Sequence, residues 1–140
     1  MNRYVVDASV AIKWFLPEDF SEHSERLLSS SVELIFPDLV ISEMGNILWK
    51  YIARGECSHN KAIGILRQIQ SPTLHMWSTA IIAEDALVIA CRTKRTFYDS
   101  VYIALAVKAE CRMVTADLKL YNALKGTSLK KHILWIEDIP

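Results

Sequence analysis

The segment Thr96-Phe97-Tyr98-Asp99-Ser100-Val101-Tyr102-Ile103-Ala104-Leu105-Ala106-Val107 places one acidic residue at the start of a long apolar run. Residues 101–107 contain no charge and no glycine or proline that would interrupt a helix. An apolar run without a polar side indicates a helix that is buried on most of its faces. Asp99 falls in the first turn of this predicted helix, so the best-buried element of the chain holds its carboxylate.

Asp99 has two interpretations on this pattern alone. Thr96 and Asp99 have the spacing of a capping box, in which the acid also lies near the positive end of the helix dipole. In the other interpretation, the carboxylate belongs to a catalytic site. The positions of the remaining acids bear on this choice.

The composition indicates one ordered, globular domain over residues 1–140, long enough to bury about two-thirds of its unfolded surface. Half of the residues are apolar, yet no run suits a membrane span and the N-terminus has no signal-peptide pattern. The three cysteines form no C-x-x-C pair, which argues against a zinc site or a disulfide framework and favours the cytoplasm. Sixteen basic residues balance sixteen acidic ones, so net charge gives no argument for nucleic-acid binding.

Short apolar strands alternate with helical segments along the chain. This order predicts an α/β fold, with a central parallel sheet of about five short strands and helices on both faces. The strands are expected at residues 4–6, 34–36, 73–77, 111–115 and 132–136. The helices are expected at residues 8–15, 19–31, 37–54, 58–70, 79–94, around Asp99 and at 117–124, with Pro37 starting the third.

Four acids are predicted to lie near one edge of this sheet, where parallel α/β proteins bind their ligands. Asp7 follows the first strand and Asp117 follows the fourth; Glu43 lies in the helix after the second strand, and Asp99 opens the helix before the fourth. Each also has a structural interpretation. Asp7 and Asp117 can be N-caps, and Glu43 can be a solvated helix acid.

A cluster of carboxylates has an energetic consequence. Two charges about 4 Å apart repel each other by about 4 kcal/mol at an effective dielectric constant near 20. Such a cluster must take up protons or bind cations, and oxygen ligands suit Mg²⁺ or Mn²⁺ better than Zn²⁺. Metal ions held by carboxylates are suited to phosphodiester hydrolysis.

Four segments together resemble the PIN-domain proteins of the VapC toxin type. They are Tyr4-Val5-Val6-Asp7-Ala8-Ser9-Val10-Ala11-Ile12-Lys13-Trp14-Phe15-Leu16-Pro17-Glu18, Pro37-Asp38-Leu39 leading to Glu43 and Asn46, Tyr98-Asp99-Ser100-Val101-Tyr102-Ile103-Ala104-Leu105-Ala106, and Val114-Thr115-Ala116-Asp117. Any one of these motifs is weak evidence, but the ordered set with its flanking residues is specific. The resemblance covers nearly the whole chain.

The resemblance implies a PIN fold and a Mg²⁺- or Mn²⁺-dependent ribonuclease that cuts single-stranded or structured RNA. It assigns the catalytic and metal-binding roles to Asp7, Glu43, Asp99 and Asp117, and supporting hydroxyl groups to Ser9 and Thr115. It also implies a homodimer and a small antitoxin protein that blocks the site. Lys13, Lys50, Arg54 and Arg95 are candidates for holding RNA phosphates, although the pattern favours a solvated charge for each.

Other functions are compatible with parts of the pattern. A haloacid dehalogenase-type phosphotransferase needs a second Asp where this chain has Ser9, and a response-regulator receiver does not explain Glu43 inside a helix. A non-catalytic RNA- or partner-binding module on the same scaffold stays open. So does a structure-specific DNA nuclease, because the acids do not distinguish the sugars.

Overall fold

A five-stranded sheet forms the centre of the computed structural model, which describes residues 2–140. All neighbouring strands are parallel, in the order β3-β2-β1-β4-β5. The strands are β1 (Asn2–Val6), β2 (Val32–Pro37), β3 (His75–Trp77), β4 (Arg112–Thr115) and β5 (Ile133–Trp135). The predicted α/β class, with about five short parallel strands, is confirmed.

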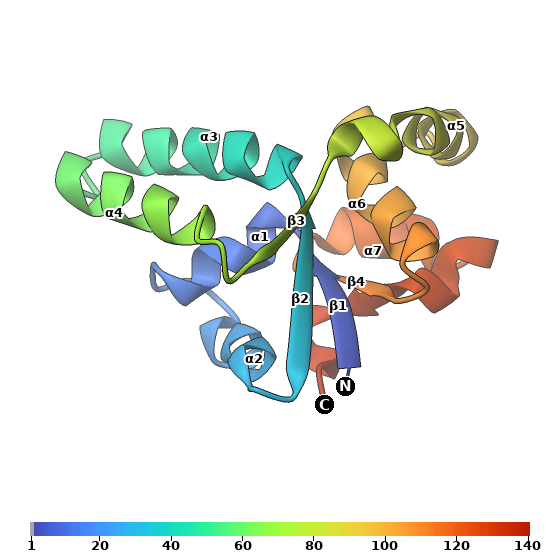
Figure 1. Cartoon of the computed structure of the whole chain (residues 1–140), viewed down its shortest axis with the longest axis horizontal. Coiled ribbons are helices and arrows are strands. Elements are labelled where there is room, and N and C mark those ends of the chain that lie inside the picture. Colours follow the sequence, from blue (N-terminus) through green and yellow to red (C-terminus); the bar gives the residue numbers. More distant parts are fainter. Residues whose placement is uncertain (1) are drawn as a thin grey trace.

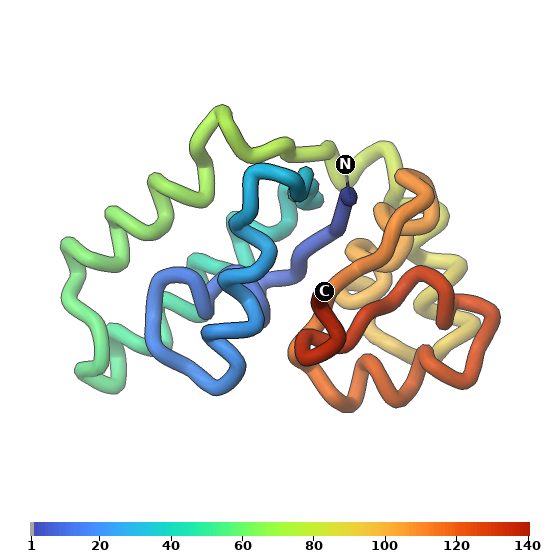
Figure 2. The backbone as a smooth tube through the Cα atoms, turned by 90° about the horizontal axis from the view of Figure 1, so that it is seen from below, coloured from blue at the N-terminus to red at the C-terminus, as the bar shows by residue number. Residues whose placement is uncertain are grey.

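Helices cover both faces of the sheet, with α1 to α4 on one side and α5 to α7 on the other (Figure 1). Figure 2 shows the same division from below, with β1 running between the two groups. The helices are α1 (Ala8–Ala11), α2 (Ser21–Glu25), α3 (Leu39–Ala53), α4 (His59–Ile69), α5 (Ala83–Thr93), α6 (Phe97–Lys108) and α7 (Leu118–Leu124). None of the helices within residues 2–140 is long and apolar enough to cross a membrane.

The order of the strands reverses its direction at β1. The chain builds outward from β1 to β2 and β3, and then returns to place β4 and β5 on the other side of β1. In such a sheet the loops after the two central strands diverge, which leaves a crevice at their carboxyl ends. Asp7 directly follows β1 and Asp117 lies two residues after β4, so both acids are at this crevice.

Helix α6 is the most buried helix of the fold, as its apolar sequence predicts. Every residue from Ser100 to Ala106 is buried, and the helix packs on β1, β2, β4 and α5. Burial of a single large apolar side chain contributes about 1.5–3 kcal/mol, so this segment is a main source of the fold's stability. Its position also fixes Asp99 in the first turn, next to the carboxyl edge of the sheet.

Several predicted helix boundaries are wrong. Pro37 does not start α3: it ends β2, where it pairs in register with Trp77, and the Asp38 backbone N–H donates to the Trp77 carbonyl at 2.8 Å. Sheet pairing therefore outweighs the preference of proline for a first helical turn. The helices expected at 8–15, 19–31 and 79–94 are each divided into a short α-helix and a 3₁₀ turn.

Candidate active site

The four predicted acids line one cavity at the carboxyl ends of β1 and β4. Its volume is about 170 Å³. It is lined by Asp7, Ala8, Ser9, Glu43, Ile47, Asp99, Tyr102 and Asp117. The acids come from four different elements: the end of β1, helix α3, the first turn of α6 and the start of α7. The fold thus brings together residues that are up to 110 positions apart in the sequence.

Asp7 both caps α1 and lines the cavity, so the capping and the site interpretations of this residue are compatible. Its Oδ1 accepts hydrogen bonds from the Val10 N–H at 3.1 Å and from the Ser9 hydroxyl at 2.6 Å. Its Oδ2 accepts from the Thr115 hydroxyl at 2.8 Å. These three donors fix the orientation of the carboxylate, which is only 7% exposed.

The hydroxyl groups of Ser9 and Thr115 also hold the loop that follows β4. The Ser9 Oγ accepts from the Ala116 N–H at 3.3 Å, and the Thr115 Oγ1 accepts from the Asp117 N–H at 3.1 Å. Asp117 in turn caps α7, because its Oδ1 accepts from the Leu120 N–H at 3.2 Å. The two hydroxyls therefore tie Asp7 and Asp117 into one hydrogen-bonded unit.

Burial changes the protonation of two of the acids. Loss of hydration raises the pKa of Asp7 to about 6, against the lowering effect of its hydrogen bonds from Ser9, Thr115 and Val10. Burial also raises the pKa of Glu43, and the negative charge of Asp99 adds to this effect. Without a cation, Asp7 therefore keeps its proton up to about pH 6, above the ordinary range of a carboxyl group.

Asp99 does not cap its own helix. The Thr96 Oγ1 is the cap of α6 and accepts from the Asp99 backbone N–H at 3.1 Å. The Asp99 carboxylate lines the cavity, and its Oδ2 accepts from the Arg95 Nη2 at 3.2 Å. The capping interpretation therefore applies to Thr96, and the side chain of Asp99 is left for the site.

Three of the four candidate RNA-binding cations are paired within the chain. The Lys13 ammonium is buried and donates to the Glu18 carboxylate at 3.1 Å. Arg54 pairs with Glu56 at 3.5 Å on the surface, and Arg95 pairs with Asp99. The Lys13 ammonium is therefore engaged inside the chain and is not a free charge on the surface.

Lys50 lies on a groove of about 510 Å³ that adjoins the acid cavity. The groove and the cavity share Glu43 and Ile47, and the groove is also lined by Leu39, Ser42, Asn46, Lys50 and Tyr98. Tyr98 is 58% exposed, although it belongs to the first turn of the otherwise buried helix α6. Sequence analysis gave Tyr98 no role of its own; its place directly before Asp99 was the available signal.

Tyr102 is a second residue of the cavity that sequence analysis did not single out. Its hydroxyl is buried and has no hydrogen-bond partner at normal length within residues 2–140. Burial raises the pKa of Tyr102, and the nearby charges of Glu43 and Asp7 raise it further. The hydroxyl thus lies near the Glu43 and Asp7 carboxylates, and its weak interaction with Glu43 partly offsets the rise in the pKa of Glu43.

Replacing Tyr102 by phenylalanine should raise the free energy of unfolding by about 1 kcal/mol, because the variant no longer buries an unsatisfied hydroxyl. Urea denaturation in EDTA measures the change. Tyr51→Phe is the matched control: the Tyr51 hydroxyl donates to the Glu18 carboxylate, so its loss should lower stability. A Tyr102→Phe protein that is less stable than the wild type would show that the hydroxyl has a partner.

The donor set of the cavity fits a hard divalent cation. Among residues 2–140, no three His, Cys, Asp or Glu side chains lie close enough together to hold a metal ion in this structure. Mg²⁺ does not require such a cage, because it retains several waters and is usually bound through one or two carboxylates. Four carboxylates around a polar cavity meet that requirement, and they lack the thiolate or imidazole ligands that Zn²⁺ prefers.

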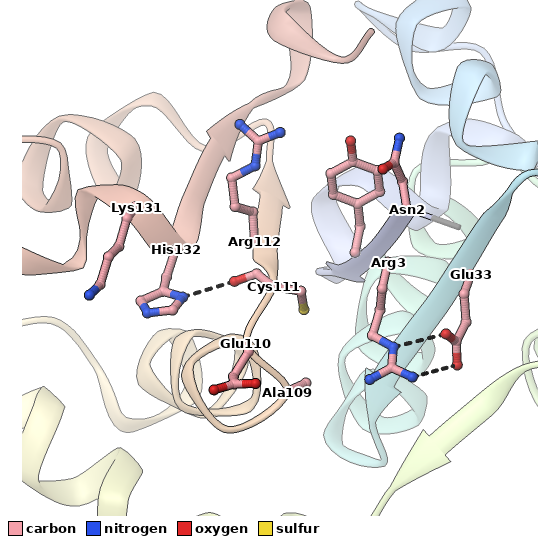
Figure 3. A pocket seen from close by; sticks show the side chains of 10 residues that line it. Asn2, Arg3, Glu33, Ala109, Glu110, Cys111, Arg112, Lys131 and His132 are labelled. Carbon is pink, nitrogen blue, oxygen red and sulfur yellow. Dashed lines mark hydrogen bonds and ion pairs between the residues drawn. The ribbon is translucent and has the colours of Figure 1, made fainter.

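A larger hollow of about 560 Å³ lies at the opposite edge of the sheet (Figure 3). Its charges have both signs and are partly paired: Arg3 binds Glu33 through two hydrogen bonds, and the His132 Nδ1 lies 2.9 Å from the Cys111 carbonyl oxygen. It is open and does not gather one kind of ligand-binding group, so the acid cavity is the better candidate site.

A parallel α/β sheet with acids gathered at its central crevice is an arrangement suited to metal-assisted chemistry. Residues 4–125 match the PIN domain family, and the chain belongs to this family.

Two relatives come from Pyrobaculum aerophilum. The chain is 35% identical over 120 residues to Ribonuclease VapC3, covering 84% of this chain and 92% of that protein. It is 27% identical over 123 residues to Exonuclease VapC9, covering 88% of this chain and 86% of the relative.

The fold is also that of VapC20 from Mycobacterium tuberculosis, a toxin that cleaves the sarcin–ricin loop. The TM-score is 0.67 at 19% identity, and the match covers 86% of this chain and 95% of the toxin.

Proposed function

We propose that this protein is a Mg²⁺- or Mn²⁺-dependent endoribonuclease that hydrolyses RNA phosphodiester bonds and acts as the toxin of a toxin–antitoxin pair. The observation that supports it best is the single cavity lined by Asp7, Glu43, Asp99 and Asp117. The 35% identity to a ribonuclease over most of both chains supports RNA as the substrate.

Each residue of the cavity has a distinct part in this proposal. The four acids would hold the cation, which when bound supplies Lewis-acid stabilisation of the phosphate and a source of hydroxide at neutral pH. The Ser9 and Thr115 hydroxyls keep the Asp7 carboxylate in one orientation through their hydrogen bonds. Glu43, which is partly buried on α3, can accept a proton from the attacking water in its ionised form.

The adjoining groove supports binding of a single-stranded segment of RNA. An exposed Tyr98 ring can stack on an unpaired base, and the Lys50 ammonium can contact a phosphate. Both residues lie on the same groove as Glu43, so a strand bound there would enter the acid cavity. A double helix would keep its bases stacked and away from Tyr98.

The proposal includes a homodimer, a small antitoxin partner, a single domain over residues 1–140 and a cytoplasmic location. Large apolar side chains are exposed on one helix and near it, which supports association: Ile81, Leu87 and Val88 are each about half exposed. The antitoxin follows from the resemblance to VapC-type toxins. Sedimentation at micromolar concentration tests the dimer, and a monomer mass would contradict it.

Cleavage of a circular single-stranded RNA tests the proposed function. Purified protein with Mg²⁺ or Mn²⁺ should open the circle, and EDTA should stop the reaction because the acids then lack their cation. A linear end-labelled RNA and a single-stranded DNA of the same sequence are the controls.

Each alternative gives a different result in this assay. A binding module shifts the RNA in a gel and leaves it intact, and a DNA nuclease cuts the DNA. An exonuclease degrades the linear RNA and leaves the circle closed. Opening of the circle at full rate in EDTA would contradict the metal-dependent mechanism.

A further inference from the structure

Arg95 lies in the short connection between α5 and α6, and its backbone there is tightly held. Lys94 has the left-handed conformation (φ 59°) and donates its N–H to the Ala90 carbonyl at 2.9 Å. The Thr93 hydroxyl donates to the Ile89 carbonyl at 2.8 Å and accepts from the Arg95 N–H at 3.3 Å. The turn therefore gives the Arg95 side chain a fixed starting point beside the first turn of α6.

The side chain of Arg95 lines a small hollow between α5, α6 and α7. This hollow is too narrow for water and is lined by Ile89, Thr93, Arg95, Asp99, Ser100, Ile103, Leu120 and Leu124. The guanidinium Nε is buried without a hydrogen-bond partner among residues 2–140, while Nη2 reaches the Asp99 Oδ2 at 3.2 Å. An unsatisfied buried donor is unfavourable, so the contact with Asp99 is made despite a loss elsewhere.

This contact gives the acid cavity a permanent positive charge from the chain itself. Of the charged pairs in the described part of the chain, Arg95–Asp99 is the one that includes an acid of the cavity. Only about a quarter of each of the two side chains is exposed, so solvent screens the pair less than it screens a surface pair. Arginine does not lose its proton in proteins, so the charge is present at every working pH.

We infer that Arg95 is a positioning residue that holds one oxygen of Asp99. It is also an internal counter-ion of the acid cavity, and it weakens the binding of a divalent cation in the absence of RNA. The inference rests on the proposed metal-dependent function. A cation that enters the cavity meets four carboxylates, but one of them is already engaged by Arg95. The RNA phosphate would then supply the missing negative charge when substrate binds.

Two simpler roles for Arg95 make different predictions. If the pair only stabilises the start of α6, removal of the guanidinium changes stability and leaves cation affinity unchanged. If Arg95 is a ligand for an RNA phosphate, its removal weakens RNA binding and also leaves cation affinity in RNA-free protein unchanged. Only the counter-ion role predicts that RNA-free protein binds a divalent cation more tightly once the Arg95 guanidinium is removed.

Titration of RNA-free protein with Mn²⁺ in a calorimeter tests the inference. Arg95→Met keeps an apolar stem in the hollow and removes the charge, so it should bind Mn²⁺ about tenfold more tightly than the wild type. Arg95→Lys keeps the charge and should stay within about threefold of the wild type. Arg92→Met is the matched control, because it removes an exposed charge of α5 that has no part in the site.

A double variant tests whether the gain in Mn²⁺ affinity depends on Asp99. The gain from Arg95→Met should be smaller in an Asp99→Asn background, because the guanidinium and the cation then no longer compete for the Asp99 carboxylate. If the Met variant does not fold, as judged by circular dichroism, Arg95→Gln removes the same charge and retains a donor.

Equal or weaker Mn²⁺ binding by the folded uncharged variants would overturn the inference and leave the proposed function standing. If none of the proteins, wild type included, binds Mn²⁺ without RNA, the inference is overturned, and cleavage of the circular RNA with and without EDTA decides the metal-dependent function separately.

Discussion

Replacement of Asp7 by asparagine should reduce RNA cleavage at least about a thousandfold, which corresponds to about 4 kcal/mol of lost transition-state stabilisation. Asp7 follows the central strand, and its two oxygens are held by three donors, so its charge has one fixed place in the cavity. Asparagine has nearly the same shape and keeps a carbonyl oxygen for the Val10 N–H and the Ser9 hydroxyl. The substitution therefore removes the charge that a cation would need, without removing the N-cap of α1.

Single-turnover cleavage of the same RNA by both proteins measures this effect. Asp85→Asn is the control, because Asp85 is an exposed acid on α5 outside the cavity and its loss should leave the rate within about twofold. Circular dichroism and urea unfolding establish that both variants are folded. An Asp7→Asn protein with more than a tenth of the wild-type rate would place the catalytic site elsewhere on the molecule.

The elements nearest the site could be predicted from the sequence because local patterns determine them. The uncharged run from Val101 to Val107 has no polar side, which indicates a buried element, and α6 is buried along seven consecutive residues. Asp7 directly follows one short strand and Asp117 lies two residues after another, and the carboxyl ends of parallel strands lie at one edge. The gathering of the four acids at that edge was therefore foreseeable from strand order and spacing.

Contacts that depend on the packing of distant elements could not be predicted in this way. Lys13 is buried because Glu18 accepts from both its ammonium and the hydroxyl of Tyr51, which lies on α3. Pro37 stays in the sheet because β3, which follows two helices later, pairs with it. Arg95 is four residues from Asp99, but the hollow that its side chain lines is formed in part by α7. Each of these contacts depends on where a third element packs, and the local sequence does not specify that position.

The free energy of unfolding in EDTA should fall as the pH rises from 4 to 7, because of Asp7. The ordinary pKa of the carboxyl is 3.8, and burial raises it to about 6 in the folded chain. Below pH 4 the group is protonated in both states. Between these values the unfolded chain releases the proton first, so the stability that the protonated group contributes is lost as the pH rises through about 6.

The size of this change follows from the separation of the two pKa values, which corresponds to about 3 kcal/mol for a fully buried group. Asp7→Asn has no proton to lose at this position, and the Thr115 hydroxyl can rotate to accept from the new amide. The variant should therefore match the wild type near pH 4 and exceed its stability by up to about 3 kcal/mol at pH 7.5.

Urea unfolding of both proteins in EDTA, from pH 4 to 8, measures the difference directly and cancels the titration of all other groups. At pH 7.5, Mg²⁺ should then stabilise the wild type more than the variant, because the cation replaces the proton as the partner of the Asp7 carboxylate. Parallel stability curves for the two proteins would show that Asp7 is hydrated and ionised in the folded chain. A cavity that holds an ionised Asp7 without a cation would have no electrostatic need for one.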